Sequence, residues 1–389
     1  MNRLQKLHEL GQSTWLNYLN RPFVQSGELR LRVADGIQGF TANAAIFDTI
    51  LTSTTAYDEA ILQQVKAGVT APEIHDKLMV HDIQIAADIM HSIYQESDGL
   101  EGYISLELNP GLMHDTTNTI AEVTHLETLI NKPNSMVEVP ATPAGIAAVK
   151  QLTKDGVSIN ITHVFSVDVY EQIARAYLEG LQIFLDTHSV WRFVPVSVVS
   201  FSLSPVDELV DPMLADKGKP KMLAKTAIAI AKLLHQRSQQ IFSGPDWEKL
   251  AKKGGVVLRP KWSRTMPRNP ALPETYYLEA LIGENTVTTF SPITLLAFMQ
   301  HGRIVPTLTK DIDAAREHVD QLAQLDIDIE AIARDLQQDY LLRSEKQFME
   351  IVRHISQKRE VLELQALDTA VHPDLLTATT SAQPSRKSG

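Results

Sequence analysis

Two glutamates interrupt apolar, alternating segments of the chain, and their carboxyl groups are the strongest candidates for chemistry. Glu107 lies within residues 102–108 and Glu138 within residues 136–140. If these segments are neighbouring strands, about 4.8 Å apart, the two carboxyl groups nearly touch and cannot both easily ionise. Such a pair offers a proton donor beside a proton acceptor, which suits general acid–base catalysis. The alternative is a structural ion pair of one carboxylate with Arg264 or a lysine.

A metal centre is the less favoured interpretation of the same residues. Alternation along residues 158–164 puts Asn160 and Thr162 on one face and His163 on the other, so no histidine falls at a strand end on the inward face. The chain contains no cysteine, which excludes disulfides, thiolate nucleophiles, Cys-zinc sites and iron–sulfur clusters. We therefore expect no metal and no cofactor.

Polar residues near other strand ends are candidates for holding a substrate. In a barrel of parallel strands, the inward side chains at the C-terminal strand ends form the active site. Besides the two glutamates, the residues that fall at such positions and are predicted to bind substrate are Asn17, Thr41, Asn43, Asn160, Thr162, Ser200, Arg264 and Arg268.

The elements that must position these side chains are short β-like runs between long helical patterns. The runs cover residues 13–18, 37–41, 102–108, 136–140, 158–164, 196–203, 256–262 and 286–290. Apolar residues at helical spacing occupy residues 72–95, 118–130, 143–154, 167–186, 222–241 and 309–343, the last broken near Asp326. Eight strands alternating with helices predict the α/β class, specifically a (β/α)8 TIM barrel with extra N- and C-terminal helices.

The chain of 389 residues is longer than the ~250 residues of a bare barrel, and its C-terminal part accounts for some of the difference. Residues 344–370 read as a C-terminal helix packed over the barrel, so residues 1–370 are predicted to form a single domain. The small, polar residues 371–389 are predicted to be a disordered tail.

Composition narrows the class of partner. Lys and Arg total 36 against 47 Asp and Glu, which gives a formal net charge of −11. The chain has no long basic run, and both features argue against binding to nucleic acid. No apolar run approaches the ~20 residues of a membrane span, and the N-terminus has no signal-peptide pattern. We expect a cytoplasmic protein whose partner is a small-molecule substrate. The sequence indicates no oligomeric state.

Several segments at the strand ends resemble the transaldolase family in its longer bacterial form, from about Gly11 to Gly302. The matching motifs, in order, are Gln12-Ser-Thr-Trp-Leu-Asn17, Gly39-Phe-Thr-Ala-Asn-Ala-Ala-Ile-Phe47, Gly102-Tyr-Ile-Ser-Leu-Glu-Leu-Asn-Pro110, His114-Asp-Thr-x-x-Thr-Ile-Ala-Glu122, Lys132-Pro-Asn, Pro140-Ala-Thr-Pro-x-Gly145, Asn160-Ile-Thr-x-x-Phe-Ser166 and Arg268-Asn-Pro270. This resemblance implies the same barrel.

The chain departs from the family at the residues that carry its chemistry. Transaldolases form a Schiff base between a ketose and a lysine of the fourth strand, in the pattern Met-Ile-Lys-Ile-Pro-Ala-Thr. Here the lysine position is Glu138, and a carboxylate cannot form an imine. The family's first-strand aspartate, a proton-transfer residue, is Asn17, and its phosphate-binding arginine falls on Pro205.

Three hypotheses follow, and the first is favoured. It is a repurposed acid–base enzyme of the isomerase, lyase or cyclase type, with Glu138 and Glu107 as catalytic residues, acting on a metabolite that is not a typical phosphosugar. The second is a non-catalytic relative with a binding or regulatory role. The third, least favoured, is transaldolase activity through Lys261, because alternation relative to Arg264 predicts that Lys261 points outward.

Overall fold

The computed structural model describes residues 1–188 and 194–371, and its centre is a closed barrel of eight parallel strands. The strands pair in chain order and β8 pairs with β1. Their bounds are β1 Gln12–Leu16, β2 Gly39–Thr41, β3 Tyr103–Glu107, β4 Ser135–Pro140, β5 Ile159–Val164, β6 Val198–Ser202, β7 Arg259–Ser263 and β8 Thr286–Phe290. Each strand overlaps a predicted run, so the predicted TIM barrel is confirmed.

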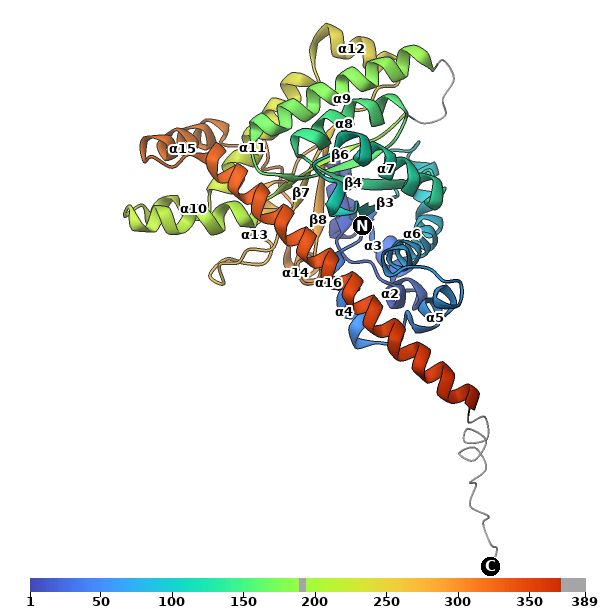
Figure 1. The fold of residues 1–389 in the computed structure, drawn as a ribbon. Coiled ribbons are helices and arrows are strands. Elements are labelled where there is room, and N and C mark those ends of the chain that lie inside the picture. The colour runs from blue at the N-terminus through green and yellow to red at the C-terminus, as the bar shows by residue number, and fades with distance from the viewer. Residues whose placement is uncertain (189–193, 372–389) are drawn as a thin grey trace, which may run out of the picture.

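Helices surround the barrel on its outside (Figure 1). Before β3 lie α1 Arg3–Glu9, α2 Arg21–Gln25, α3 Glu28–Asp35, α4 Ala44–Ser53, α5 Asp58–Lys66 and α6 Ala71–Glu96. Next come the 3₁₀ turn η1 Pro110–Leu112, α7 Thr116–Ile130, α8 Pro143–Lys154, α9 Val167–Thr187, α10 Ser204–Asp216, η2 Pro220–Met222, α11 Thr226–Ile241 and α12 Gly244–Lys252. The last are α13 Tyr276–Ala280, α14 Pro292–His301, α15 Ile312–Gln324 and α16 Ile329–Val371. No helix of the described residues is both long and apolar enough to cross a bilayer.

Local sequence explains where α8 begins, immediately after the strand that carries Glu138. Thr142 caps the helix by accepting a hydrogen bond from the N–H of Gly145, and Pro143 occupies the first helical position. Gly145 is required because a Cβ there would lie 1.9 Å from the carbonyl oxygen of Pro140. The turn after β4 is therefore fixed by residues within five positions of the strand end.

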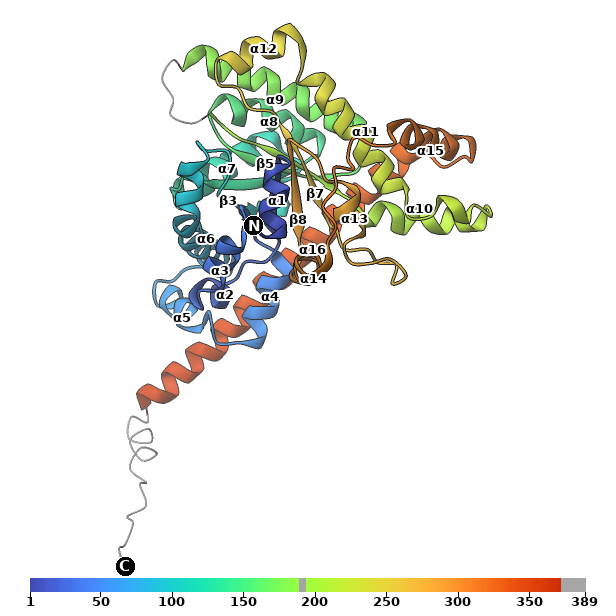
Figure 2. The same ribbon diagram turned by 180° about the vertical axis from the view of Figure 1, so that it is seen from behind.

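The helix α16 crosses the end of the barrel where the strands finish. It contacts η1, α4 and α10, each of which follows a strand, and Figures 1 and 2 show it running diagonally from α15 past α4 and α5. A break near Asp326 is confirmed, since this residue lies between α15 and α16 with φ of 56°. Residues 344–370 are helical, but the prediction that they form a separate helix is wrong, because α16 runs without a break from Ile329 to Val371.

The interior of the barrel contains an apolar cluster that includes Trp15, Tyr103, Met136, Val198 and Val287. Residues 372–389, most of the predicted tail, lie outside the described residues, so the predicted disorder there stays a prediction.

Candidate active site

A cavity of about 120 Å³ opens at the C-terminal ends of the strands and collects most of the predicted site. Of the ten predicted residues, eight line it: Asn17, Thr41, Asn43, Glu107, Glu138, Thr162, Ser200 and Arg264. Asn160 is fully buried at the cavity floor. Arg268 is not among the lining residues, and its side chain is 72 % exposed beside Glu208.

Neighbouring strands contribute one layer of hydrogen-bonded side chains at the floor of the cavity. Lys261 of β7 donates to Ser200 of β6 over 3.2 Å, and Ser200 donates to Asn160 Oδ1 of β5 over 2.7 Å. Asn160 Nδ2 then donates to Glu138 Oε1 of β4 over 3.3 Å. The Ser105 hydroxyl of β3 closes the layer with a 2.8 Å hydrogen bond to the same oxygen. These side chains therefore hold one another in fixed orientations.

Lys261 is the cation of this layer, and the prediction that it points outward is wrong. The side chain is 3 % exposed and lines the cavity, with Nζ 5.3 Å from the centre of the Trp15 ring. Along β7 the inward residues are Arg259, Lys261 and Ser263. Arg264 follows the end of the strand with φ of 50°, so the alternation rule does not extend to it. Counting back from Arg264 therefore assigned the wrong face.

Burial sets the pKa of Lys261. Removal from water disfavours the ammonium form, and the charge of Glu138 only partly opposes this, so the pKa falls to about 8. Burial in turn raises the pKa of Glu138, against the opposing effects of Lys261 and of the hydrogen bonds from Ser105 and Asn160. An amine of this kind is a free base in part at neutral pH and can act as a nucleophile.

Glu107 is the second carboxyl group of the site, and its register partner is Glu138, as predicted. Its side chain is exposed to the cavity, although it lies deep among protein atoms. Burial and the charge of Glu138 raise the pKa of Glu107 to about 7, while Arg264 and the Ala44 N–H oppose the rise. A group that titrates near neutral pH can both accept and donate a proton.

Arg264 and His163 line the cavity, and both pack against Tyr340 of α16. The Arg264 guanidinium stacks 4.4 Å from the centre of the Tyr340 ring, and His163 packs on the same ring at 6.1 Å. The register shift in β5 between Ile161 and Val164 coincides with a φ of 59° at His163. The expectation that His163 faces away from the site is therefore wrong. Burial and Arg264 lower its pKa to about 4, so the ring is neutral.

Three polar atoms in the cavity wall are buried without a hydrogen-bond partner. They are Asn17 Oδ1, Thr41 Oγ1 and Thr289 Oγ1. A buried polar group without a partner is costly, so the wall of the cavity carries polar groups whose hydrogen bonds are not made within the protein. Within the described part of the chain there is no group of three His, Asp or Glu residues placed to hold a metal ion.

The sequence assigned Lys261 and His163 to the wrong face, and it gave no prediction for three further cavity residues, Ser202, Ser263 and Thr289. A signal for Lys261 was present, since Arg259, Lys261 and Ser263 place polar side chains at every second position of one strand. A strand enclosed by helices can face polar groups only inward. No comparable signal marks His163, because its position depends on the irregular turn of β5.

Comparison with known proteins identifies the family. The family model described as Transaldolase/Fructose-6-phosphate aldolase matches residues 14–355. This chain belongs to the transaldolase family. A transaldolase of Neisseria gonorrhoeae is 35 % identical over 352 residues, which cover 90 % of this chain and 99 % of the relative. A transaldolase of Trichodesmium erythraeum is 35 % identical over 84 % of this chain and 89 % of the relative. A transaldolase of Frankia alni is 32 % identical over 92 % of this chain and 97 % of the relative.

These comparisons overturn the favoured functional hypothesis. A repurposed isomerase, lyase or cyclase is contradicted, because the relatives that match most of the chain are named transaldolases. The reasoning failed at the step from one missing lysine to lost Schiff-base chemistry. The cavity contains a different buried lysine, Lys261, on another strand.

Proposed function

We propose that this protein is an enzyme that forms a Schiff base between Lys261 and the carbonyl group of a ketose, and then transfers the resulting carbon fragment. The observation that carries the proposal is the position of Lys261, whose amine lies inside the barrel cavity with a pKa of about 8. Roughly a tenth of such a group is free amine at pH 7. Family membership supports the same reaction class.

The chemistry begins with attack of the Lys261 amine on the ketose carbonyl carbon. A C–N bond forms, and the carbonyl oxygen leaves as water, which gives a protonated imine. This imine accepts the electron pair of the C3–C4 bond as that bond breaks, and the C4 hydroxyl loses its proton. An aldehyde departs and an enamine stays on Lys261. Addition of the enamine to a second aldehyde, followed by hydrolysis, completes the transfer.

Glu107 is the group proposed to carry the C4 hydroxyl proton. Its pKa of about 7 and its exposure to the same cavity as Lys261 suit this role. The family's first-strand aspartate is replaced by Asn17, which cannot accept a proton at neutral pH. Asn17 is instead proposed to orient a substrate hydroxyl group.

Glu138 is proposed to act through Lys261 rather than on the substrate. The layer from Lys261 through Ser200 and Asn160 to Glu138 fixes the position of Nζ. The charge of Glu138 keeps the pKa of Lys261 from falling further. Residues 138 and 261 both line the barrel cavity. The family's lysine at the position of Glu138 and Lys261 of this chain would therefore each place an amine in the same cavity.

The proposed substrate is a small phosphosugar, such as fructose 6-phosphate. Arg264, which lines the cavity, is the candidate phosphate ligand, since guanidinium groups bind phosphate oxygens through charged hydrogen bonds. Its stacking on Tyr340 holds the planar group in place. This arginine follows β7, whereas the position that matches the family's phosphate-binding arginine is Pro205.

The proposal is tested by measuring glyceraldehyde 3-phosphate release from fructose 6-phosphate in the presence of an aldehyde acceptor. Lys261→Met should abolish release, because methionine fills similar space without an amine. Lys310→Met is the matched control, since Lys310 is an exposed lysine outside the cavity. Full activity in Lys261→Met would contradict the proposal.

A further inference from the structure

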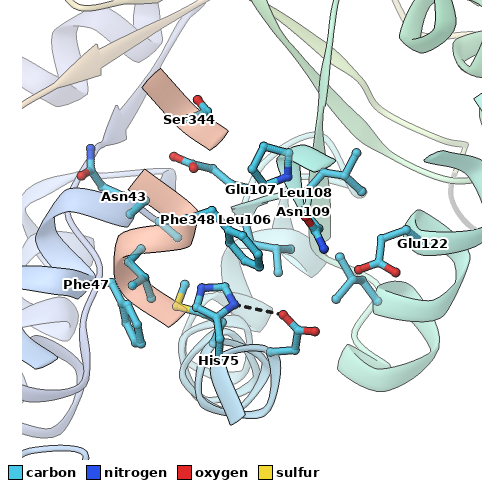
Figure 3. A pocket seen from close by; sticks show the side chains of 17 residues that line it. Asn43, Phe47, His75, Leu106, Glu107, Leu108, Asn109, Glu122, Ser344 and Phe348 are labelled. Carbon is cyan, nitrogen blue, oxygen red and sulfur yellow. Dashed lines mark hydrogen bonds and ion pairs between the residues drawn. The ribbon is translucent and has the colours of Figure 1, made fainter. Parts of the chain in front are cut away.

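A groove between α11 and α15, on the outside of the barrel, is separate from the active site. The cavity beside β3 in Figure 3 is not, because Asn43 and Glu107 line both it and the active-site cavity. The α11–α15 groove consists of two hollows, of about 380 and 670 Å³, which share Lys221 and Gln321. In the described part of the chain, no residue lines both this groove and the active-site cavity. The groove is therefore a candidate for a second binding site.

Lysines gather around this groove although the chain as a whole is acidic. Helices α10, α11 and α15 lie together on one flank of the barrel, away from α5 (Figures 1 and 2). Residues 217–232 contain five lysines and no Asp or Glu, in a chain with a formal net charge of −11. The four that line the groove are Lys219, Lys221, Lys225 and Lys232.

Two of these lysines bind backbone carbonyl groups in place of carboxylates. Lys225 Nζ donates to the carbonyl oxygen of Lys221 over 2.6 Å, and Lys232 Nζ donates to that of Lys310 over 2.7 Å. Neither charge is neutralised by an ion pair within the described part of the chain. The groove therefore presents positive charge that the protein itself leaves open to an anion.

The burial of Lys232 is the observation that points most directly to a ligand. The residue is 8 % exposed, yet it lines the groove. Its ammonium group can donate three hydrogen bonds, of which one is made among the described residues. Burial lowers its pKa, and the charge of Asp311 only partly opposes this. An anion in the groove would complete the hydrogen bonds of an ammonium group that is partly removed from water.

The spacing of the lysines suits a ligand with more than one anionic group. Lys225 and Lys232 are seven residues apart on α11, so they share a face of the helix and lie about 10 Å apart along its axis. Ile228 and Ala229 lie on that face between them, and Ala315 of α15 also lines the groove. The apolar surface between the amines suits the carbon body of a ligand.

The carboxylates of the groove are confined to one of its hollows. Asp311 and Glu317 line the smaller hollow. The larger hollow contains Lys219 and Lys221 and, among the described residues, no carboxylate. A ligand with a single weak negative charge gains little at so mixed a surface, whereas phosphate groups, which concentrate charge on several oxygens, gain more from the lysines.

We propose that the α11–α15 groove is a binding site for a small ligand that carries two or more phosphate groups on an apolar body, as a nucleoside polyphosphate does. The phosphate groups contact the lysines of η2 and α11, and the body lies over Ile228 and Ala229. This site goes beyond the proposed Schiff-base function and does not depend on it.

The test is isothermal titration calorimetry of the full-length protein at low ionic strength, without divalent cations. The probes are ATP, tripolyphosphate and adenosine. ATP should bind, tripolyphosphate should bind several-fold more weakly because it lacks the apolar body, and adenosine should show no measurable binding. No binding of ATP, or binding of adenosine as tight as that of ATP, would overturn the proposal. Equal binding of tripolyphosphate and ATP would overturn the role of the apolar body.

Two variants remove single cations from the groove. Lys225→Gln, at an exposed position, and Lys232→Met should each raise the Kd for ATP about tenfold. Lys217→Gln is the matched control, because Lys217 is an exposed lysine of the same segment that lines neither hollow. Its Kd should equal that of the wild-type protein. An unchanged Kd in Lys225→Gln, or an equal loss in Lys217→Gln, would refute the site.

A third variant separates this groove from the active site. Arg264 is the proposed phosphate ligand of the active-site cavity, so Arg264→Leu should bind ATP with the wild-type Kd. If Arg264→Leu loses ATP binding, the nucleotide occupies the active site and the groove is refuted. The Schiff-base function is tested independently by Lys261→Met, and that variant should bind ATP as the wild-type protein does.

Discussion

Replacing Glu138 by glutamine removes a charge that acts on Lys261 and keeps the shape of the side chain. The amide oxygen can still accept from Ser105 and Asn160, which donate to Oε1 in the native layer. The charge of Glu138 raises the pKa of Lys261 against the larger effect of burial. Without that charge, the buried ammonium is less stable and loses its proton at lower pH.

The expected magnitude follows from the pKa of about 8 for Lys261. Loss of a nearby opposite charge typically shifts a pKa by about one unit or more. A fall to ~7 raises the free amine at pH 7 from roughly a tenth to roughly half. The rate of imine formation at pH 7 should therefore rise about fivefold in Glu138→Gln, and the midpoint of its pH dependence should move down by about one unit.

The assay is single-turnover trapping of fructose 6-phosphate with borohydride, in a series of buffers on both sides of the midpoint. Glu127→Gln is a matched control, because Glu127 is a partly buried glutamate whose pKa is also raised to about 7, but it accepts a hydrogen bond from Ser135 and lies outside the cavity. Its midpoint should equal that of the wild-type protein. An unchanged or higher midpoint in Glu138→Gln would refute the reasoning.

Three further predictions concern neighbouring groups. Glu107→Gln should preserve imine trapping but slow C–C cleavage by about 10²–10⁴-fold; equal loss of trapping and cleavage would contradict a proton-transfer role. Arg264→Leu should raise the KM for fructose 6-phosphate by about tenfold or more and leave that for fructose unchanged. Arg268→Leu, at an exposed position, should change neither KM. Gly145→Ala should lower the free energy of unfolding by about 3 kcal/mol or more, because its Cβ would lie 1.9 Å from the Pro140 oxygen; an unchanged thermal melt would contradict this.

The barrel could be predicted because the sequence of each strand and of each helix start carries a local pattern. Residues 158–164 alternate polar and apolar groups, and β5 occupies Ile159–Val164. Thr142 and Pro143 mark the start of α8 at the expected position. The sequence predicts that Glu107 and Glu138 lie on neighbouring strands, and the two are register partners.

The rest depended on tertiary contacts that periodicity does not encode. Lys261 was assigned the wrong face because Arg264 lies beyond the strand in a left-handed conformation. The sequence predicts a helix boundary near residue 344, but α16 continues across it. Helical periodicity does not show whether two successive helical segments form one helix or two. Helix α16 brings Tyr340 to Arg264, a contact between distant parts of the chain. The cytoplasmic location stays a prediction.

The identity of the residue that carries the substrate tests the account most directly. The wild-type protein is incubated with fructose 6-phosphate, reduced with borohydride, digested and sequenced by mass spectrometry. The account predicts a stable three-carbon adduct on Lys261, in the peptide that contains β7. An adduct on another lysine, or no adduct while glyceraldehyde 3-phosphate is released, would contradict it.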